Sequence, residues 1–189
     1  MAVAAGFGYT LVVIEDGNLC SFGDNRNGQL GVGDFHAHLE PCVLNYIDTF
    51  GGHEVVMVAG ASSFCACVTK DGLLWKWGMN MGWMQDEGDN DDEPYRCTPR
   101  KMCMSTHGNS PVVMVSCGSG FILILTAAGR IWSFGSGSGF ELGHGNRDPC
   151  PVPTCIDLAR FNRAEIGMVS AVGTHCMAVS KTGGRVWTW

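Results

Sequence analysis

Short apolar runs alternate with glycine-containing turns along the chain, a pattern typical of β-strands joined by tight turns. Four apolar runs cover residues 11–14, 65–68, 122–125 and 177–179. Each is followed by a turn, and the four turns read EDGN, KDGL, AAGR and TGGR. Asp-Gly and Gly-Gly pairs favour hairpins because glycine accepts positive φ at little cost. A second run follows each turn and ends in an aromatic residue, so the pattern predicts four β-hairpins.

None of the four apolar runs shows a clean alternation of apolar and polar side chains. Alternation is the pattern of a strand with one face in water, whereas runs that are apolar throughout are typical of strands covered on both faces. We therefore expect the first strand of each hairpin to lie between two neighbouring sheets. Five tryptophans fall on the second strands at equivalent positions, which predicts a place in the core: Trp75, Trp77, Trp132, Trp187 and Trp189.

The hairpins belong to a longer repeat. Their opening glycines, Gly6, Gly60, Gly118 and Gly173, are separated by 54, 58 and 55 residues. A second block recurs with identical spacing, as GDNRNGQLGVGD at residues 23–34 and GSGSGFELGHGN at residues 135–146. Repeats of this length indicate an architecture such as a propeller or a solenoid. We place the units at residues 1–54, 55–112, 113–166 and 167–189.

This repeat resembles the regulator of chromosome condensation repeat. The resemblance lies in the hairpin, G-x-x-[HY]-T-L followed by D-G-x-[LV]-x-[SW]-[FW]-G, and in the tail N-x-x-G-Q-L-G-x-G-D, which the first unit matches most fully. It implies an all-β fold, a β-propeller of four-stranded antiparallel blades, with seven blades in complete members. The chain would then be incomplete, with about three and a half blades.

Three explanations of the incomplete blade count remain open. The sequence is a fragment or a truncated gene model, or it forms an open partial solenoid whose edges are covered in another way, or two copies complete one ring. Closure protects the strand edges of a propeller. Open blade edges therefore also predict self-association.

Acidic residues outnumber basic ones, and the excess lies in one segment. There are 12 Lys and Arg against 18 Asp and Glu, a net charge of −6. Six of the acids fall between residues 86 and 93, and a small basic cluster follows directly. The candidate partner-contact surface is this charged stretch: Asp86, Glu87, Asp89, Asp91, Asp92, Glu93, Arg96, Arg100 and Lys101. Since the sequence has no basic stripe, we expect no direct binding to nucleic acid.

Motifs for catalysis, cofactors and metals are missing from the sequence. There is no Walker loop, nucleophile elbow or paired C-x-x-C knuckle, so we expect no catalytic residues, no cofactor and no metal. The ten cysteines lie mostly in apolar runs, and there is no signal peptide, spanning helix or N-x-[ST] site. That combination predicts a reduced cytoplasmic or nuclear protein without membrane contacts.

The sequence therefore predicts a non-catalytic scaffold for protein–protein interaction, since a propeller presents loops around a rigid frame. The resemblance also implies an alternative, a guanine-nucleotide exchange factor for a Ran-like small GTPase. Such a protein would use the inter-repeat loops at residues 34–54, 84–112 and 144–166. A regulatory domain of a larger signalling or ubiquitin-ligase protein is a further alternative. Apart from exchange activity, we expect no enzymatic function.

Overall fold

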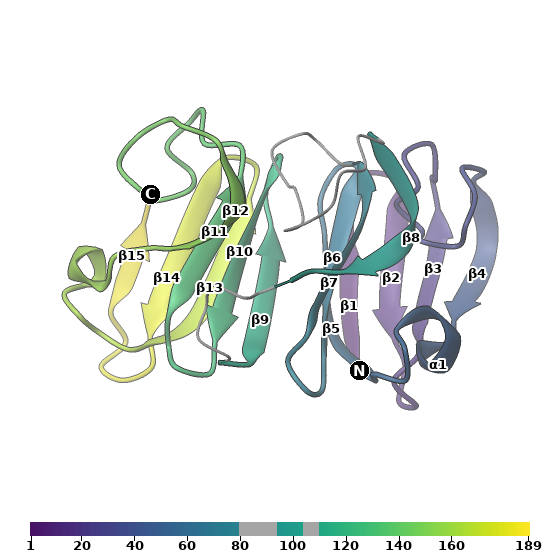
Figure 1. The fold of residues 1–189 in the computed structure, drawn as a ribbon, viewed down its shortest axis with the longest axis horizontal. Helices are drawn as coiled ribbons and strands as arrows, with labels where there is room; N and C mark the ends of the chain where they lie inside the picture. Colours follow the sequence, from purple (N-terminus) through teal and green to yellow (C-terminus); the bar gives the residue numbers. More distant parts are fainter. Residues whose placement is uncertain (80–93, 104–109) are drawn as a thin grey trace. The chain divides into compact units, whose positions relative to one another are not determined.

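The computed structural model describes residues 1–79, 94–103 and 110–189, which form four antiparallel sheets. Successive strands along the chain lie side by side in each sheet (Figure 1). Sheet A contains β1 (Ala2–Ala5), β2 (Tyr9–Val13), β3 (Leu19–Gly23) and β4 (His38–Leu44). Sheet B contains β5 (Val55–Gly60), β6 (Phe64–Thr69), β7 (Leu74–Met79) and β8 (Tyr95–Lys101).

The second half of the chain repeats this arrangement. Sheet C contains β9 (Val112–Cys117), β10 (Phe121–Thr126), β11 (Ile131–Gly135) and β12 (Cys150–Cys155). Sheet D contains β13 (Ile166–Val172), β14 (His175–Ser180) and β15 (Val186–Thr188). The chain divides into two compact units, of which unit 1 holds sheets A and B and unit 2 holds sheets C and D. These sheets confirm the prediction of an all-β fold.

Within the described residues, helical structure is confined to short connections. Helix α1 (Tyr46–Thr49) follows sheet A, and a 3₁₀ helix, η2 (Leu158–Phe161), follows sheet C. No helix in the part of the chain that the structure describes is long and apolar enough to cross a membrane.

Glycines close the predicted hairpins. Between β2 and β3, Gly17 has a φ of 81° and its N–H donates to Ile14 O. Such a φ lies in the left-handed region, where a side chain would strain the backbone. At the end of β3, a side chain on Gly23 would place its Cβ 2.4 Å from Gly8 O. The glycines that mark the repeat in the sequence are therefore required by the turns and by the close approach of neighbouring strands.

Each unit has a hydrophobic core between its two sheets. In unit 1, Tyr9 and Leu11 of β2 belong to one buried cluster with Val58 of β5 and Trp77 of β7. Tyr9 also ties the two sheets together, because its hydroxyl donates to Ala61 O at 2.7 Å. The core of unit 2 is built from the corresponding strands: Phe121, Leu123, Ile131, Ile166, Val169 and Ala178.

The strands predicted to be covered on both faces fall into two kinds. All six residues of β6 and of β10 are buried, as predicted. In β2 and β14, buried positions alternate with more exposed ones, so the prediction is wrong for these two strands. One face of β2 packs toward β5. The other face carries a cross-strand row of apolar side chains, of which two are exposed and two partly exposed: Val3, Val43, Val12 and Cys20.

Candidate functional site

The charged surface predicted from the sequence is only partly described. Its six carboxylates, Asp86, Glu87, Asp89, Asp91, Asp92 and Glu93, lie outside the described residues. Its three basic residues lie on β8, the strand at one edge of sheet B. Arg100 and Lys101 are exposed, whereas the Arg96 side chain is only 5% exposed. Of the described part, Arg100 and Lys101 are therefore the two residues accessible to a partner.

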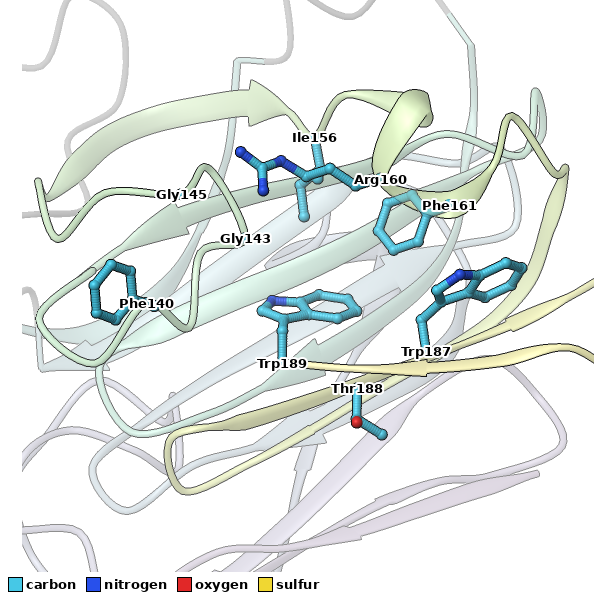
Figure 2. A pocket seen from close by; sticks show the side chains of 9 residues that line it. All are labelled: Phe140, Gly143, Gly145, Ile156, Arg160, Phe161, Trp187, Thr188 and Trp189. Carbon is cyan, nitrogen blue, oxygen red and sulfur yellow. The ribbon is translucent and has the colours of Figure 1, made fainter.

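A pocket of about 200 Å³ opens in unit 2, and four of its nine lining residues are aromatic. Figure 2 shows Trp187 of β15 and Trp189, the residue after β15, pointing into this pocket, while Thr188 points the other way. Phe161 packs edge-on to Trp187, with ring centroids 5.8 Å apart. The ring of Trp189 is held by a hydrogen bond from its Nε1 to Glu141 O at 2.9 Å.

The same ring cluster occurs in unit 1, but there a strand covers it. Phe50 packs against Trp75 with ring centroids 5.3 Å apart, and Trp77 Nε1 donates to Gln29 O at 2.8 Å. Strand β8 lies beside these rings, because Trp75 pairs with Lys101. Trp75 and Trp77 are accordingly buried, as the sequence predicts, whereas Trp187 and Trp189 are only partly buried. In unit 1 the counterparts of Gly143 and Ile156, Gly31 and Leu44, also line a cleft, but Thr98 and Pro99 of β8 stand in its wall in place of the tryptophan rings.

The loop between β3 and β4, residues 24–37, is held in place by its own buried amides. Asn25 and Gln29 are fully buried. Asn25 Nδ2 donates to Asp34 O at 2.9 Å, and Asn25 Oδ1 accepts from Leu30 N at 2.9 Å. The N–H of Gly33 donates to Cys97 O at 2.8 Å, which ties the loop to β8. The N-x-x-G-Q-L-G-x-G-D block of the sequence therefore encodes a rigid loop.

This loop presents an aromatic residue to solvent. Phe35 is 45% exposed and stacks edge-on to Tyr95 of β8, which is 40% exposed, with ring centroids 6.5 Å apart. The next residue, His36, has a side chain that is 88% exposed. We call Phe35, His36 and Tyr95 the loop surface. Phe35 and His36 lie in the predicted contact segment 34–54, and Tyr95 lies in the predicted segment 84–112. Nothing local in the sequence indicates that residues 35 and 95 meet.

The described residues carry no ready-made metal centre. Within residues 1–79, 94–103 and 110–189, no group of three or more His, Cys, Asp or Glu side chains is placed to hold a metal ion. All ten cysteines are free thiols. The candidate site among the described residues is the loop surface beside β8.

Comparison with known proteins identifies the family to which this architecture belongs. The model of the regulator of chromosome condensation (RCC1) repeat matches residues 16–68 and 128–179, together more than half of the chain. The human WBSCR16 structure superposes with a TM-score of 0.87 at 25% identity, over 99% of this chain and 46% of that one. Yeast RCC1 (Prp20), solved with Kap60 bound, superposes with a TM-score of 0.78 at 25% identity, over 99% and 42% of the two chains. The fold is therefore part of a β-propeller, as predicted, and the chain belongs to the RCC1 repeat family.

Relatives of known function share the whole length of the chain but are longer. The ultraviolet-B receptor UVR8 of Arabidopsis thaliana is 30% identical over 187 residues, which are 99% of this chain and 40% of the receptor. The human E3 ubiquitin-protein ligase HERC2 is 32% identical over 193 aligned residues, which are 100% of this chain and 4% of the ligase. The chain thus spans less than half the length of each of these relatives.

Proposed function

We propose that the chain is a protein-binding scaffold and that the loop surface of unit 1 contacts the partner. The observation that carries this proposal is the exposed Phe35–Tyr95 pair on a loop pinned by buried amides. Aromatic residues are enriched at the centres of protein interfaces. A loop that is already ordered loses little conformational entropy when it binds. Rigid support and exposed rings are together what a protein-recognition loop requires.

The relatives support a binding role without fixing the partner. The yeast protein Prp20p, whose structure superposes with a TM-score of 0.75 at 21% identity, is described with its binding to Gsp1p and histones. HERC2 is a ubiquitin-protein ligase in which the matching segment is 4% of the length. We infer that in this chain, too, the propeller supplies contact and any catalysis belongs to other parts of an assembly.

Site-specific photo-crosslinking tests the proposal. A photoreactive phenylalanine at position 35 should give a discrete protein adduct in cells, and Tyr95→Ala should reduce that adduct several-fold. Phe140 provides the matched control, since it is also 45% exposed and lies on the corresponding loop of unit 2. Equal adducts from positions 35 and 140, or an adduct that Tyr95→Ala leaves unchanged, would contradict a role for the loop surface.

A second candidate function is nucleotide exchange on a Ran-like small GTPase. The similarity to Prp20p, with its reported binding to Gsp1p, is the observation that favours it. Release of a fluorescent guanine nucleotide from purified Gsp1p tests it directly. Faster release in the presence of the chain supports exchange activity. Binding of Gsp1p without faster release supports the scaffold, and a GTPase that does not bind removes this candidate.

A further inference from the structure

Three side chains, Asp34 from the loop before β4 and His38 and Cys42 from β4, form a hydrogen-bonded chain that the sequence did not predict. His38 Nε2 lies 3.1 Å from Asp34 Oδ2, and His38 Nδ1 lies 3.2 Å from Cys42 Sγ. The imidazole therefore bridges a carboxylate and a thiol through its two nitrogens. His38 and Cys42 both lie on β4, where a regular strand would keep residues four apart well separated. The irregular register between β3 and β4 brings them together.

The hydrogen bonds of Asp34 fix which imidazole nitrogen carries the proton. The backbone N–H of His36 donates to Asp34 Oδ1 at 2.9 Å, and Asn25 Nδ2 donates to the same oxygen at 3.0 Å. The His36 N–H, aided by the His38 ring and Asn25, holds the pKa of Asp34 below its ordinary value, against a rise from desolvation. An ionised carboxylate only accepts hydrogen bonds, so His38 donates its Nε2–H to Asp34. Nδ1 is then left as the acceptor for the Cys42 thiol.

Cys42 is accessible from a cleft. It is half-buried and lines a cleft of about 390 Å³ on unit 1, together with Gly31, Leu44, Thr49 and Pro99 among others. A volume of this size lies in the range of small-molecule sites. Two other thiols, Cys67 and Cys176, are buried. Burial raises the pKa of Cys176 to about 12, with the Glu141 carboxylate adding to the rise, and burial alone raises the pKa of Cys67.

We propose that Cys42 is a nucleophilic thiol that takes a small disulfide, with His38 as its base and Asp34 as a positioning residue. A thiol next to a base that is itself oriented by a third group is the arrangement of an activated nucleophile. Thiol–disulfide exchange needs only a thiolate and an accessible sulfur, and the cleft provides the access.

The step balances within the two reactants. His38 Nδ1 takes the proton from Cys42 Sγ, and the thiolate attacks one sulfur of the disulfide. A new S–S bond forms to Cys42 while the S–S bond of the small molecule breaks, and the departing thiolate takes the proton from His38. Cys42 is thereby oxidised to a mixed disulfide and half of the small molecule is reduced to a thiol.

The neighbouring cysteine of sheet A is not placed to resolve this mixed disulfide. Cys42 lies opposite Ser21 in the β3–β4 register, and Cys20 lies opposite Val43. Successive side chains on a strand point to opposite faces, so Cys20 and Cys42 lie on opposite faces of the sheet. The mixed disulfide at Cys42 is therefore the expected product.

Unit 2 contains a matched control in its own fold. Ser133 pairs with Thr154 as Ser21 pairs with Cys42, and Gly135 pairs with Cys150 as Gly23 pairs with His38. The thiol of Cys150, also half-buried, meets the Thr154 hydroxyl at 2.8 Å instead of an imidazole. Cys150 thus stands in the same part of the repeat without the base.

The experiment treats the whole protein with glutathione disulfide at neutral pH and follows each cysteine by peptide mass mapping. We expect Cys42 to form the mixed disulfide at least about tenfold faster than Cys150, as general-base assistance is worth that much or more. In urea, where the imidazole no longer holds the thiol, the two rates should become similar. This comparison needs no variant, so it does not depend on a variant folding. Equal rates in the folded protein would overturn the proposal.

Variants distinguish a role of His38 as a base from a role in packing against Cys42. His38→Ala should slow mixed-disulfide formation at Cys42 to about the rate at Cys150. Free imidazole should restore part of the lost rate at Cys42 and should not change the rate at Cys150. Asp34→Asn should slow mixed-disulfide formation at Cys42 less than His38→Ala does. Nitrogen chemical shifts of His38 should report the Nε2–H tautomer in the parent protein and a mixture in Asp34→Asn. A Cys42 rate unchanged by His38→Ala, or a tautomer unchanged by Asp34→Asn, would contradict the assigned role of that residue.

Discussion

Units 1 and 2 are built on one frame, and their contacts recur between residues 111 or 112 positions apart. Trp77 Nε1 donates to Gln29 O at 2.8 Å in unit 1, and Trp189 Nε1 donates to Glu141 O at 2.9 Å in unit 2. A serine on the third strand donates to a leucine carbonyl in both, at 2.8 and 2.7 Å. These hydrogen bonds join strands to loops in both units. We call the strands and contacts that the two units share the frame.

The two units differ in the loop that follows this serine. Asn25, which pins the loop of unit 1 through buried hydrogen bonds, has Gly137 as its counterpart in unit 2. Gly28, with a φ of 74°, has Phe140 as its counterpart, with a φ of 70°. A bulky residue at positive φ is strained, whereas glycine is not. The frame is thus repeated while the loops diverge, so the chemistry specific to one unit is to be sought in its loops.

Removing the shared tryptophan gives the largest expected effect and tests how well each unit is covered. Trp77 is 2% exposed, so Trp77→Ala should lower the free energy of unfolding by about 3–5 kcal/mol. Trp189→Ala should cost roughly half as much or less, because part of its ring is already in water. Urea denaturation followed by far-ultraviolet circular dichroism measures both. Equal losses would mean that the ring cluster of unit 2 is as well covered as that of unit 1.

Much of the frame could be predicted from the sequence because its signals are local. The EDGN, KDGL and AAGR turns need glycine at positive φ, and Gly17, Gly72 and Gly129 have it. The two-face burial was right for β6 and β10 but wrong for β2 and β14. An apolar run indicates that a strand can be buried on both faces. Whether both faces are in fact covered depends on whether another sheet packs against each of them.

The candidate sites were harder to predict because they join distant or irregular positions. Phe35 meets Tyr95 across sixty residues of sequence, through the placement of β8 beside the loop. The bridge from Asp34 to Cys42 depends on β4 beginning at His38 after an irregular register with β3. Neither the sheet edge nor the register irregularity has a sequence signal of its own.

Removing the amide of Asn25 should give an intermediate effect and sharpen the contrast between the loops. Asn25→Ala leaves the buried N–H of Leu30 without the acceptor seen at 2.9 Å. We expect a loss of about 1–3 kcal/mol, the cost of an unpaired buried donor, together with faster hydrogen exchange at Leu30. Asn146→Ala is the control, since Asn146 is exposed on the corresponding loop of unit 2 and should change stability by about 0.5 kcal/mol or less. Similar losses in both variants would show that the two loops are pinned alike.

The smallest expected effect concerns an ion pair that both units share. Lys70 Nζ lies 2.8 Å from Glu54 Oε2, and Lys181 Nζ lies 2.6 Å from Glu165 Oε1. The hydrogen bond to Glu54 raises the pKa of Lys70 above its ordinary 10.5. A raised lysine pKa contributes stability that is complete below the ordinary value and is lost as the pH rises through the higher one.

At neutral pH the raised pKa keeps Lys70 protonated. Both ion pairs are nevertheless exposed to water and salt, which leaves little net stabilisation. Lys70→Met and Lys181→Met should each leave the urea midpoint unchanged within experimental error, at low and at moderate salt. A urea midpoint lowered in only one variant would show that the ion pair stabilises one unit and not the other, although the two pairs have similar geometry. Equal and negligible effects would leave the buried rings and the loop amides as the contacts that distinguish them.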